Sequence, residues 1–173
     1  MSTSDRVTPT GGFTLMELIV VTCLLSLFLM FSVPRLQMLI PMDHLNASVR
    51  RIMATVTELK NVSLRDCRYY TLHLDMHQRL MWISHEYMTE TDVDAAKKGG
   101  FRLPADVHIQ DVMMSDSGKT SSGIAEIFFS SRGYSSKAII HLKGTSGGTV
   151  SLLIESFLPD VQLFNRRITF QDG

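Results

Sequence analysis

Glu17 is the residue whose chemistry most needs a partner, because it lies near the start of a long apolar run. The stretch from Thr8 to Arg35 reads TPTGGFTLMELIVVTCLLSLFLMFSVPR, and it is apolar from Phe13 to Val33 apart from this carboxylate. An ionisable side chain inside a membrane-spanning segment costs about 2.5–3.5 kcal/mol. A chain that keeps a carboxylate there is therefore expected to provide it with a partner.

Three other groups of residues could carry chemistry, and their spacing argues against each. The SGKT segment at 117–120 resembles the end of a phosphate loop, but Met113 stands where that loop needs a glycine. His73 and His77 would lie about 13 Å apart on a strand, which is too far to share one metal ion. The sequence pattern does not place a histidine and acid constellation around Cys67, which favours a free structural thiol over a nucleophile. We therefore predict no enzyme activity, no catalytic residue, no metal site and no cofactor.

The composition fits one domain of ordinary size without a nucleic-acid partner. The chain has 173 residues, of which 17 are basic and 17 acidic, so its formal net charge is zero. A balanced charge does not favour nucleic acid as a partner. The two cysteines, Cys23 and Cys67, are too few for a disulfide framework.

The apolar run predicts a transmembrane helix over residues 13–33. At 1.5 Å per residue, this run covers roughly 30 Å, the thickness of the hydrocarbon core of a bilayer. A cleaved secretory signal is the competing interpretation. It is disfavoured because the segment before the run holds only Asp5 and Arg6, and SVPRLQ after it contains no small-x-small cleavage site.

An amphipathic helix is expected to follow over residues 34–66, ending near Asp66. Its apolar residues recur at alternating steps of four and three, which places them on one face, and they are Leu45, Val49, Ile52, Val56 and Leu59. Pro34 and Pro41 interrupt the chain here, and a proline inside a helix removes a hydrogen bond and bends it. We expect a bent helix whose apolar face is covered by a sheet.

The remaining residues, 67–173, predict a β-rich globular domain. Segments with strand-like patterns are separated by turn signals, and they cover residues 69–76, 79–84, 107–114, 124–130, 137–143, 149–156 and 166–171. Residues 86–100 are polar and end in glycine, which is typical of a mobile surface loop. The fold class expected is α+β, with one long N-terminal transmembrane and amphipathic helix packed on an antiparallel β-sheet.

The segment GGFTLMELIVV resembles the leader and first helical turns of type IV pilins and of type II secretion pseudopilins. In that family a prepilin peptidase cuts after the glycine and methylates the new N-terminus. The resemblance implies a leader over residues 1–12, cleavage between Gly12 and Phe13, and N-methylation of Phe13. Glu17 falls at the acidic position of the family, and Pro34 matches a common helix proline.

The family resemblance implies a location and a set of partners. The chain is expected to be a single-pass protein of the bacterial inner membrane with its C-terminal domain in the periplasm. The expected partners are the prepilin peptidase, other minor and major pseudopilins, and the inner-membrane assembly platform.

Cleavage before Phe13 would also explain the carboxylate of Glu17. The cut creates a free α-amine, and Phe13 and Glu17 are four residues apart, so they share one helix face. In an assembly of subunits, the amine of one chain could pair with Glu17 of its neighbour. Desolvation offsets much of the Coulombic attraction, so such a pair would set the register of assembly more than it would store stability.

The segment IFFSSRGYSSKAIIHL is similar to the phenylalanine-then-glycine segment of H-type minor pseudopilins. Phe128 or Phe129, Gly133 and Ser135 would carry this similarity, although a generic hairpin explains the same residues. The expected function is a minor pseudopilin, a structural subunit of the pseudopilus of a type II secretion system. A minor pilin of a type IV pilus is the alternative, and a membrane-anchored enzyme or binding domain is less favoured.

If GGFTL is a processing site, the mature chain should begin at Phe13 and carry a methylated amine. Mass spectrometry of the intact protein purified from cells measures both. Replacing Gly12 with a bulky residue should leave the leader attached, since the peptidase needs a small residue at the cut. An uncut chain that begins at Met1, or a mature start after Val33, would contradict the pilin-like interpretation.

Overall fold

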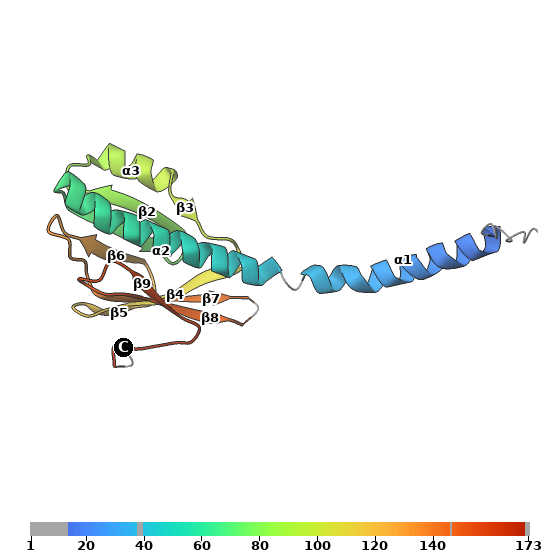
Figure 1. The fold of residues 1–173 in the computed structure, drawn as a ribbon. Coiled ribbons are helices and arrows are strands. Elements are labelled where there is room, and N and C mark those ends of the chain that lie inside the picture. The colour runs from blue at the N-terminus through green and yellow to red at the C-terminus, as the bar shows by residue number, and fades with distance from the viewer. Residues whose placement is uncertain (1–13, 38–39, 146, 172–173) are drawn as a thin grey trace, which may run out of the picture. The chain divides into compact units, whose positions relative to one another are not determined.

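The protein is described by a computed structural model, which covers residues 14–37, 40–145 and 147–171. The chain divides into two compact units, Met1–Leu39 and Ile40–Gly173, and each is described by itself. Helix α1 (Leu15–Gln37) belongs to the first unit. Helix α2 (Ile40–Asp66) and every other element belong to the second, which is called the globular unit below (Figure 1).

The single bent helix expected over residues 13–66 is wrong, because the structure has two separate helices. Helix α1 ends at Gln37 and α2 begins at Ile40. Pro41 lies in the first turn of α2. Within the first turn of α2 the missing N–H of proline has no cost, because that N–H has no partner inside the helix.

The predicted transmembrane helix and the single-pass inner-membrane location are also wrong. Among the helices that the structure describes, none is long and apolar enough to cross a membrane. Helix α1 spans Leu15–Gln37, and Glu17 interrupts its apolar residues near its start. A bilayer needs about 20 consecutive apolar residues in one helix.

Two antiparallel sheets form the globular unit, where the sequence predicted one. The four-stranded sheet has the order β3-β2-β1-β6, with β3 Phe101–Arg102, β2 Leu80–His85, β1 Tyr70–Asp75 and β6 Ile124–Phe129. The five-stranded sheet has the order β5-β4-β7-β8-β9, with β5 Gly118–Thr120, β4 Val107–Met114, β7 Ala138–Gly144, β8 Thr149–Ile154 and β9 Val161–Phe164. The observed class is therefore α+β with two antiparallel sheets.

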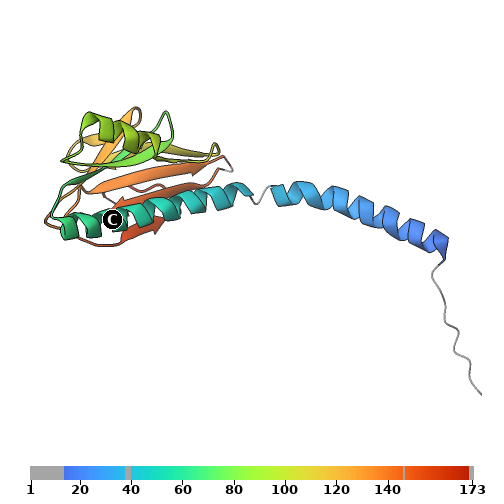
Figure 2. The same cartoon turned by 90° about the horizontal axis from the view of Figure 1, so that it is seen from above.

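Helix α2 lies against both sheets and fills the core between them (Figures 1 and 2). It contacts β1 and β6 of the four-stranded sheet and β4, β7 and β9 of the five-stranded sheet. The predicted apolar stripe is confirmed, because its five residues are at most 4% exposed, and they are Leu45, Val49, Ile52, Val56 and Leu59. One helix face therefore closes the core of two sheets.

The positions of most strands follow the sequence pattern, and one prediction fails. Strands β1, β4, β6 and β8 lie inside the segments that the pattern identified, and β2 and β7 each extend one residue beyond theirs. The predicted strand at 166–171 is wrong, and the last strand is β9, which lies earlier in the chain. A phosphate loop leads from a strand into a helix. The SGKT segment does not, because Gly118–Thr120 forms β5, which pairs with β4, and the next element is β6.

A third helix replaces the surface loop expected at 86–100. Helix α3 (Glu90–Lys98) begins at a capping box, in which the Thr89 side chain accepts from the Asp92 N–H and the Asp92 carboxylate accepts from the Thr89 N–H. Its last turn carries Lys97 and Lys98, whose positive charges interact favourably with the negative C-terminal end of the helix dipole. No residue of α3 is buried, so the apolar periodicity that reveals most helices is missing here.

Changing Ile52 to Asp should unfold the globular unit, because Ile52 is fully buried and an unpaired charge there has no partner. The matched control is Ala54→Asp, which places the same charge on the exposed face of the same helix. Thermal unfolding of both variants measures the difference. An unchanged melting temperature for Ile52→Asp would contradict the packing of α2 on the sheets.

Candidate functional site

The residues that the sequence singled out for processing and assembly fall into two groups. Gly12 and Phe13 lie outside the described residues. Glu17 lies in the first turn of α1, where its side chain is exposed. The candidate functional site is therefore the surface of α1 around and after Glu17.

Thr14 caps the N-terminus of α1 and gives Glu17 a local role that the sequence reasoning did not include. The Glu17 N–H donates to the Thr14 hydroxyl at 3.2 Å and to the Thr14 carbonyl at 3.1 Å. The two residues are three apart, which is the spacing of a capping box. A carboxylate in the first turn also interacts favourably with the positive end of the helix dipole. Glu17 therefore stabilises the start of the helix from which it projects.

The described surface of α1 is apolar on all sides of the helix. Its large apolar side chains are each 46–81% exposed, and they are Leu15, Met16, Leu18, Ile19, Val20, Val21, Leu24, Leu25 and Leu27. These nine residues are called the α1 surface below. A helix that is apolar all round is stable only where other apolar groups cover it. Covering each large side chain contributes about 1.5–3 kcal/mol.

The hydroxyl groups of Thr22 and Ser26, in the part of α1 whose side chains are described, bond within the helix itself. Thr22 donates to the Leu18 carbonyl at 3.0 Å, and Ser26 donates to the Thr22 carbonyl at 2.8 Å. A hydroxyl that bonds four residues back needs no external partner when the helix is buried. Glu17 is the one charged side chain in the described part of this surface, so it is also the group that most needs a partner once the helix is covered.

The histidines and the cysteine weighed in the sequence are not brought together. His73 lies in β1, stacked on Trp82 at 4.8 Å and 3.3 Å from the Glu126 carboxylate. Burial lowers the pKa of His73, although Glu126 opposes this shift. Cys67 is exposed at the end of α2, and the described residues contain no group of three potential metal ligands.

The segment that resembles H-type pseudopilins forms the end of β6, the turn after it and most of β7. Phe129 is fully buried, whereas Phe128 is 52% exposed. Gly133 has a φ of +85°, and a Cβ atom there would lie 2.9 Å from Leu64 of α2. Ser135 is buried and its hydroxyl donates to the Glu155 carbonyl at 3.4 Å. The glycine is therefore required by the close approach of this turn to α2.

A buried charged cluster in the five-stranded sheet was not found from the sequence. His141 is fully buried, with Nδ1 2.6 Å from the Asp111 carboxylate and Nε2 2.9 Å from the Ile168 carbonyl. Arg167 donates to Asp111 at 2.7 Å. Burial opposes ionisation of Asp111, but the hydrogen bonds from His141 and Arg167 outweigh it and lower the pKa of its carboxyl. The cluster ties the chain after β9 to strands β4 and β7.

Comparisons with known proteins identify no relative of this chain. No family model, no curated protein and no solved structure matches it. The resemblance to pilin-like proteins therefore depends on the residues quoted above.

Replacing Asp111 with Asn should destabilise the protein by about 3 kcal/mol at neutral pH, because it removes the charge of a buried carboxylate that lies 2.6 Å from His141 Nδ1 and accepts a hydrogen bond from Arg167. Since the pKa of Asp111 is lowered in the folded state, its contribution is present above about pH 4 and is lost as the pH falls further. Denaturant unfolding across this range measures it, with exposed Asp116→Asn as the control. Equal stability of the wild type and Asp111→Asn at neutral pH would show that the cluster has no structural role.

Proposed function

We propose that this protein is a minor pseudopilin, a structural subunit of the pseudopilus of a type II protein secretion system. A prepilin peptidase processes it between Gly12 and Phe13 and methylates Phe13. It then assembles with other minor and major pseudopilins through helix α1. The proposal assigns the chain a role in assembly, without an enzyme activity or a cofactor of its own.

The observation that carries this proposal is the exposed, all-round apolar surface of α1. The nine side chains of the α1 surface are exposed, and both described hydroxyls bond within the helix. Such a surface is suited to burial among other apolar helices. In a pilin-like filament, the N-terminal helices of neighbouring subunits would supply that cover.

The position of Glu17 supports the same proposal. It is exposed in the first turn of α1, beside the cap that Thr14 provides. On a neighbouring subunit, the amine created by cleavage at Phe13 would be a cation, opposite in charge to the Glu17 carboxylate. An ion pair in an otherwise apolar bundle sets the register of the helices, because a misplaced subunit would leave the carboxylate buried without a partner.

A minor pilin of a type IV pilus would carry the same N-terminal motif and the same exposed helix. The two assemblies differ in the proteins that they contain. Neighbouring genes for secretion components favour the pseudopilus, and genes for twitching motility favour the pilus.

Glu17→Gln should be processed normally but should crosslink less well to partner subunits. Glutamine keeps the shape and the capping capacity of the side chain and removes only its charge. A photo-crosslinking residue at Leu25, which is exposed on α1, reports the yield in cells. We expect a partial loss, because one ion pair of several contacts is removed, together with reduced secretion.

The control is Glu58→Gln, which makes the same change at an exposed position of α2. Mass spectrometry of each variant shows whether cleavage and methylation are intact. Lost methylation with unchanged crosslinking would show that Glu17 serves the peptidase instead of assembly. Unchanged crosslinking with normal processing would remove the role of Glu17 in subunit register.

A further inference from the structure

A hollow of about 400 Å³ lies beside the end of strand β6, and it is called the aromatic hollow below. Three of its lining residues are the aromatic residues Tyr69, Phe128 and Tyr134. Asp116 also lines it, and the remaining lining residues are serines. The aromatic hollow has no place in the proposed function, which depends on α1.

Phe128 and Tyr69 lie on the same face of the four-stranded sheet. Phe129 is fully buried and Phe128 is exposed, so the Phe128 side chain points away from the core. Tyr70 pairs with Phe129 and packs against the core. Tyr69 comes directly before Tyr70 and therefore shares the outer face with Phe128. Helix α3 packs on β2, on the other side of β1, and none of its nine described residues lines the aromatic hollow.

Tyr134 reaches the same face from the turn after β6. Its carbonyl accepts from the Ser130 N–H at 2.8 Å, and the next residue, Ser135, forms a bridge with Phe129. Ser135 is buried, as Phe129 is, so Tyr134 points to the outer face. Extending the register of β1 and β6 by one residue places Ser130 between Tyr69 and Tyr134. Because neighbouring strands are about 4.8 Å apart, the two tyrosine backbones are separated by roughly 10 Å, which leaves room for a side chain above Ser130.

The walls of the aromatic hollow are held in place before any ligand arrives. The Gly133 N–H donates to the Ser130 carbonyl at 3.0 Å, and the Ser136 N–H donates to the Phe128 carbonyl at 2.9 Å. A site that is already formed loses less free energy to ordering when its ligand binds.

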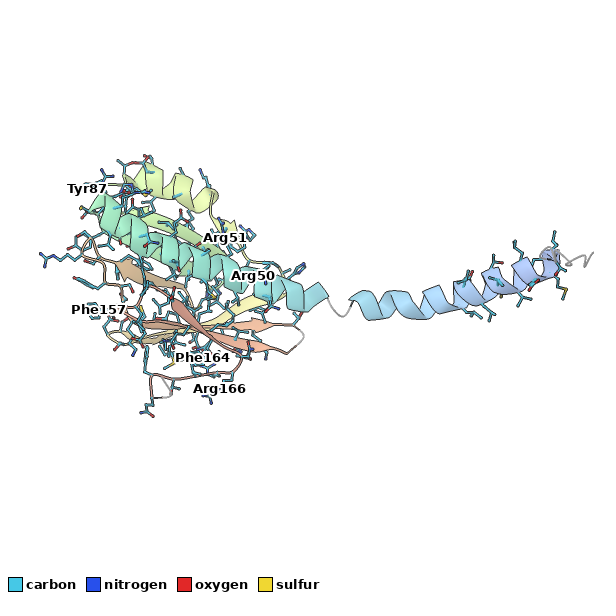
Figure 3. All side chains as sticks on the ribbon, in the orientation of Figure 1. Arg50, Arg51, Tyr87, Phe157, Phe164 and Arg166 are labelled. Carbon is cyan, nitrogen blue, oxygen red and sulfur yellow. The ribbon has the colours of Figure 1, made fainter. Side chains whose placement is uncertain are left out.

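The apolar surface continues beyond the aromatic hollow. The Phe157 ring centre lies 6.2 Å from that of Tyr134, and Phe157 is 82% exposed. Figure 3 shows Phe157 at the end of the globular unit where α2 ends. Exposed apolar surface around a hollow is typical of sites that bind another protein.

The charge of the lining favours a cation. Among the described lining residues, Asp116 is the one that carries a charge. The faces of aromatic rings also attract a cation that lies within about 6 Å of the ring centre. Two basic residues nearby in the sequence contact other groups: the Lys137 Nζ lies 2.9 Å from Glu155, and the Arg68 guanidinium carbon lies 5.3 Å from the centre of the Tyr87 ring.

A guanidinium group matches this combination better than an ammonium group does. It is planar, so it stacks on an aromatic ring while its N–H groups donate to a carboxylate. It is also more weakly hydrated than an ammonium group, which lowers the cost of entering an apolar hollow. Arginine and aromatic residues are the types most enriched where two proteins bind each other.

We propose that the aromatic hollow binds an arginine side chain of a partner protein, whose guanidinium group stacks among Tyr69, Phe128 and Tyr134 and donates to the Asp116 carboxylate. The surrounding apolar surface, which includes Phe157, would contact the residues of the partner that flank this arginine. The site belongs to the globular unit and does not depend on the proposed role of α1.

N-acetylarginine amide tests the proposal on the full-length protein in a zwitterionic detergent, since its blocked ends imitate an arginine within a chain. The protein has four tyrosines, so labelling with fluorotyrosine gives four fluorine NMR signals, which single Tyr→Phe replacements assign. We expect saturable shifts of the Tyr69 and Tyr134 signals, whereas the Tyr70 and Tyr87 signals should not move. N-acetylcitrulline amide has nearly the same shape without the charge and should bind about tenfold more weakly. N-acetyllysine amide should also bind more weakly.

Asp116→Asn should weaken the binding of N-acetylarginine amide by about tenfold, whereas Asp94→Asn should not. Both aspartates are exposed and both variants lose one negative charge, but only Asp116 lines the aromatic hollow. Phe128→Leu keeps an apolar side chain without an aromatic ring and should weaken binding by about threefold. Melting temperatures verify that the three variants are folded.

Several results would overturn the proposal. They are unmoved Tyr69 and Tyr134 signals, binding of the citrulline or lysine derivative as tight as that of the arginine derivative, equal effects of the two aspartate variants, and unchanged binding by Phe128→Leu.

Discussion

The globular unit depends on the burial of one face of α2 against two sheets that share no strand. Ile52 and Val56 are fully buried in a single core with residues of β1, β6, β4 and β7. Each sheet has an apolar face that needs a cover. Helix α2 supplies that cover for both sheets. The two sheets are therefore positioned relative to each other by the apolar face of α2, on which both pack.

The last turns of α2 also fix the loops at that end of the globular unit. Lys60 is 6% exposed, and its ammonium group donates to the Glu155 carbonyl at 2.8 Å and to the Leu158 carbonyl. Burial lowers the pKa of Lys60, while Glu155 and Asp160 oppose this shift. Close by, Leu64 touches the turn at Gly133 so closely that a side chain would not fit. The same helix therefore positions the loop after β8 and the turn after β6.

Features that depend on local periodicity could be predicted from the sequence. The apolar stripe of α2 shows as steps of four and three, and residues 124–129 form β6, inside a segment that the pattern identified. The exposed carboxylate of Glu17 and the apolar α1 surface were also visible in the sequence. The cap at Thr14 was overlooked, although the Thr-x-x-Glu spacing is a recognised signal.

Features that join distant residues could not be predicted in this way. The pairing of Tyr70 with Phe129 places β6 beside β1, and only this long-range pairing separates two sheets from one. Asp111, His141 and Arg167 meet through the same kind of contact. The globular unit closes its core with its own strands and helix, whereas α1 is apolar on every side. The apolar stripe of α2 is therefore buried within the globular unit, whereas the α1 surface is exposed.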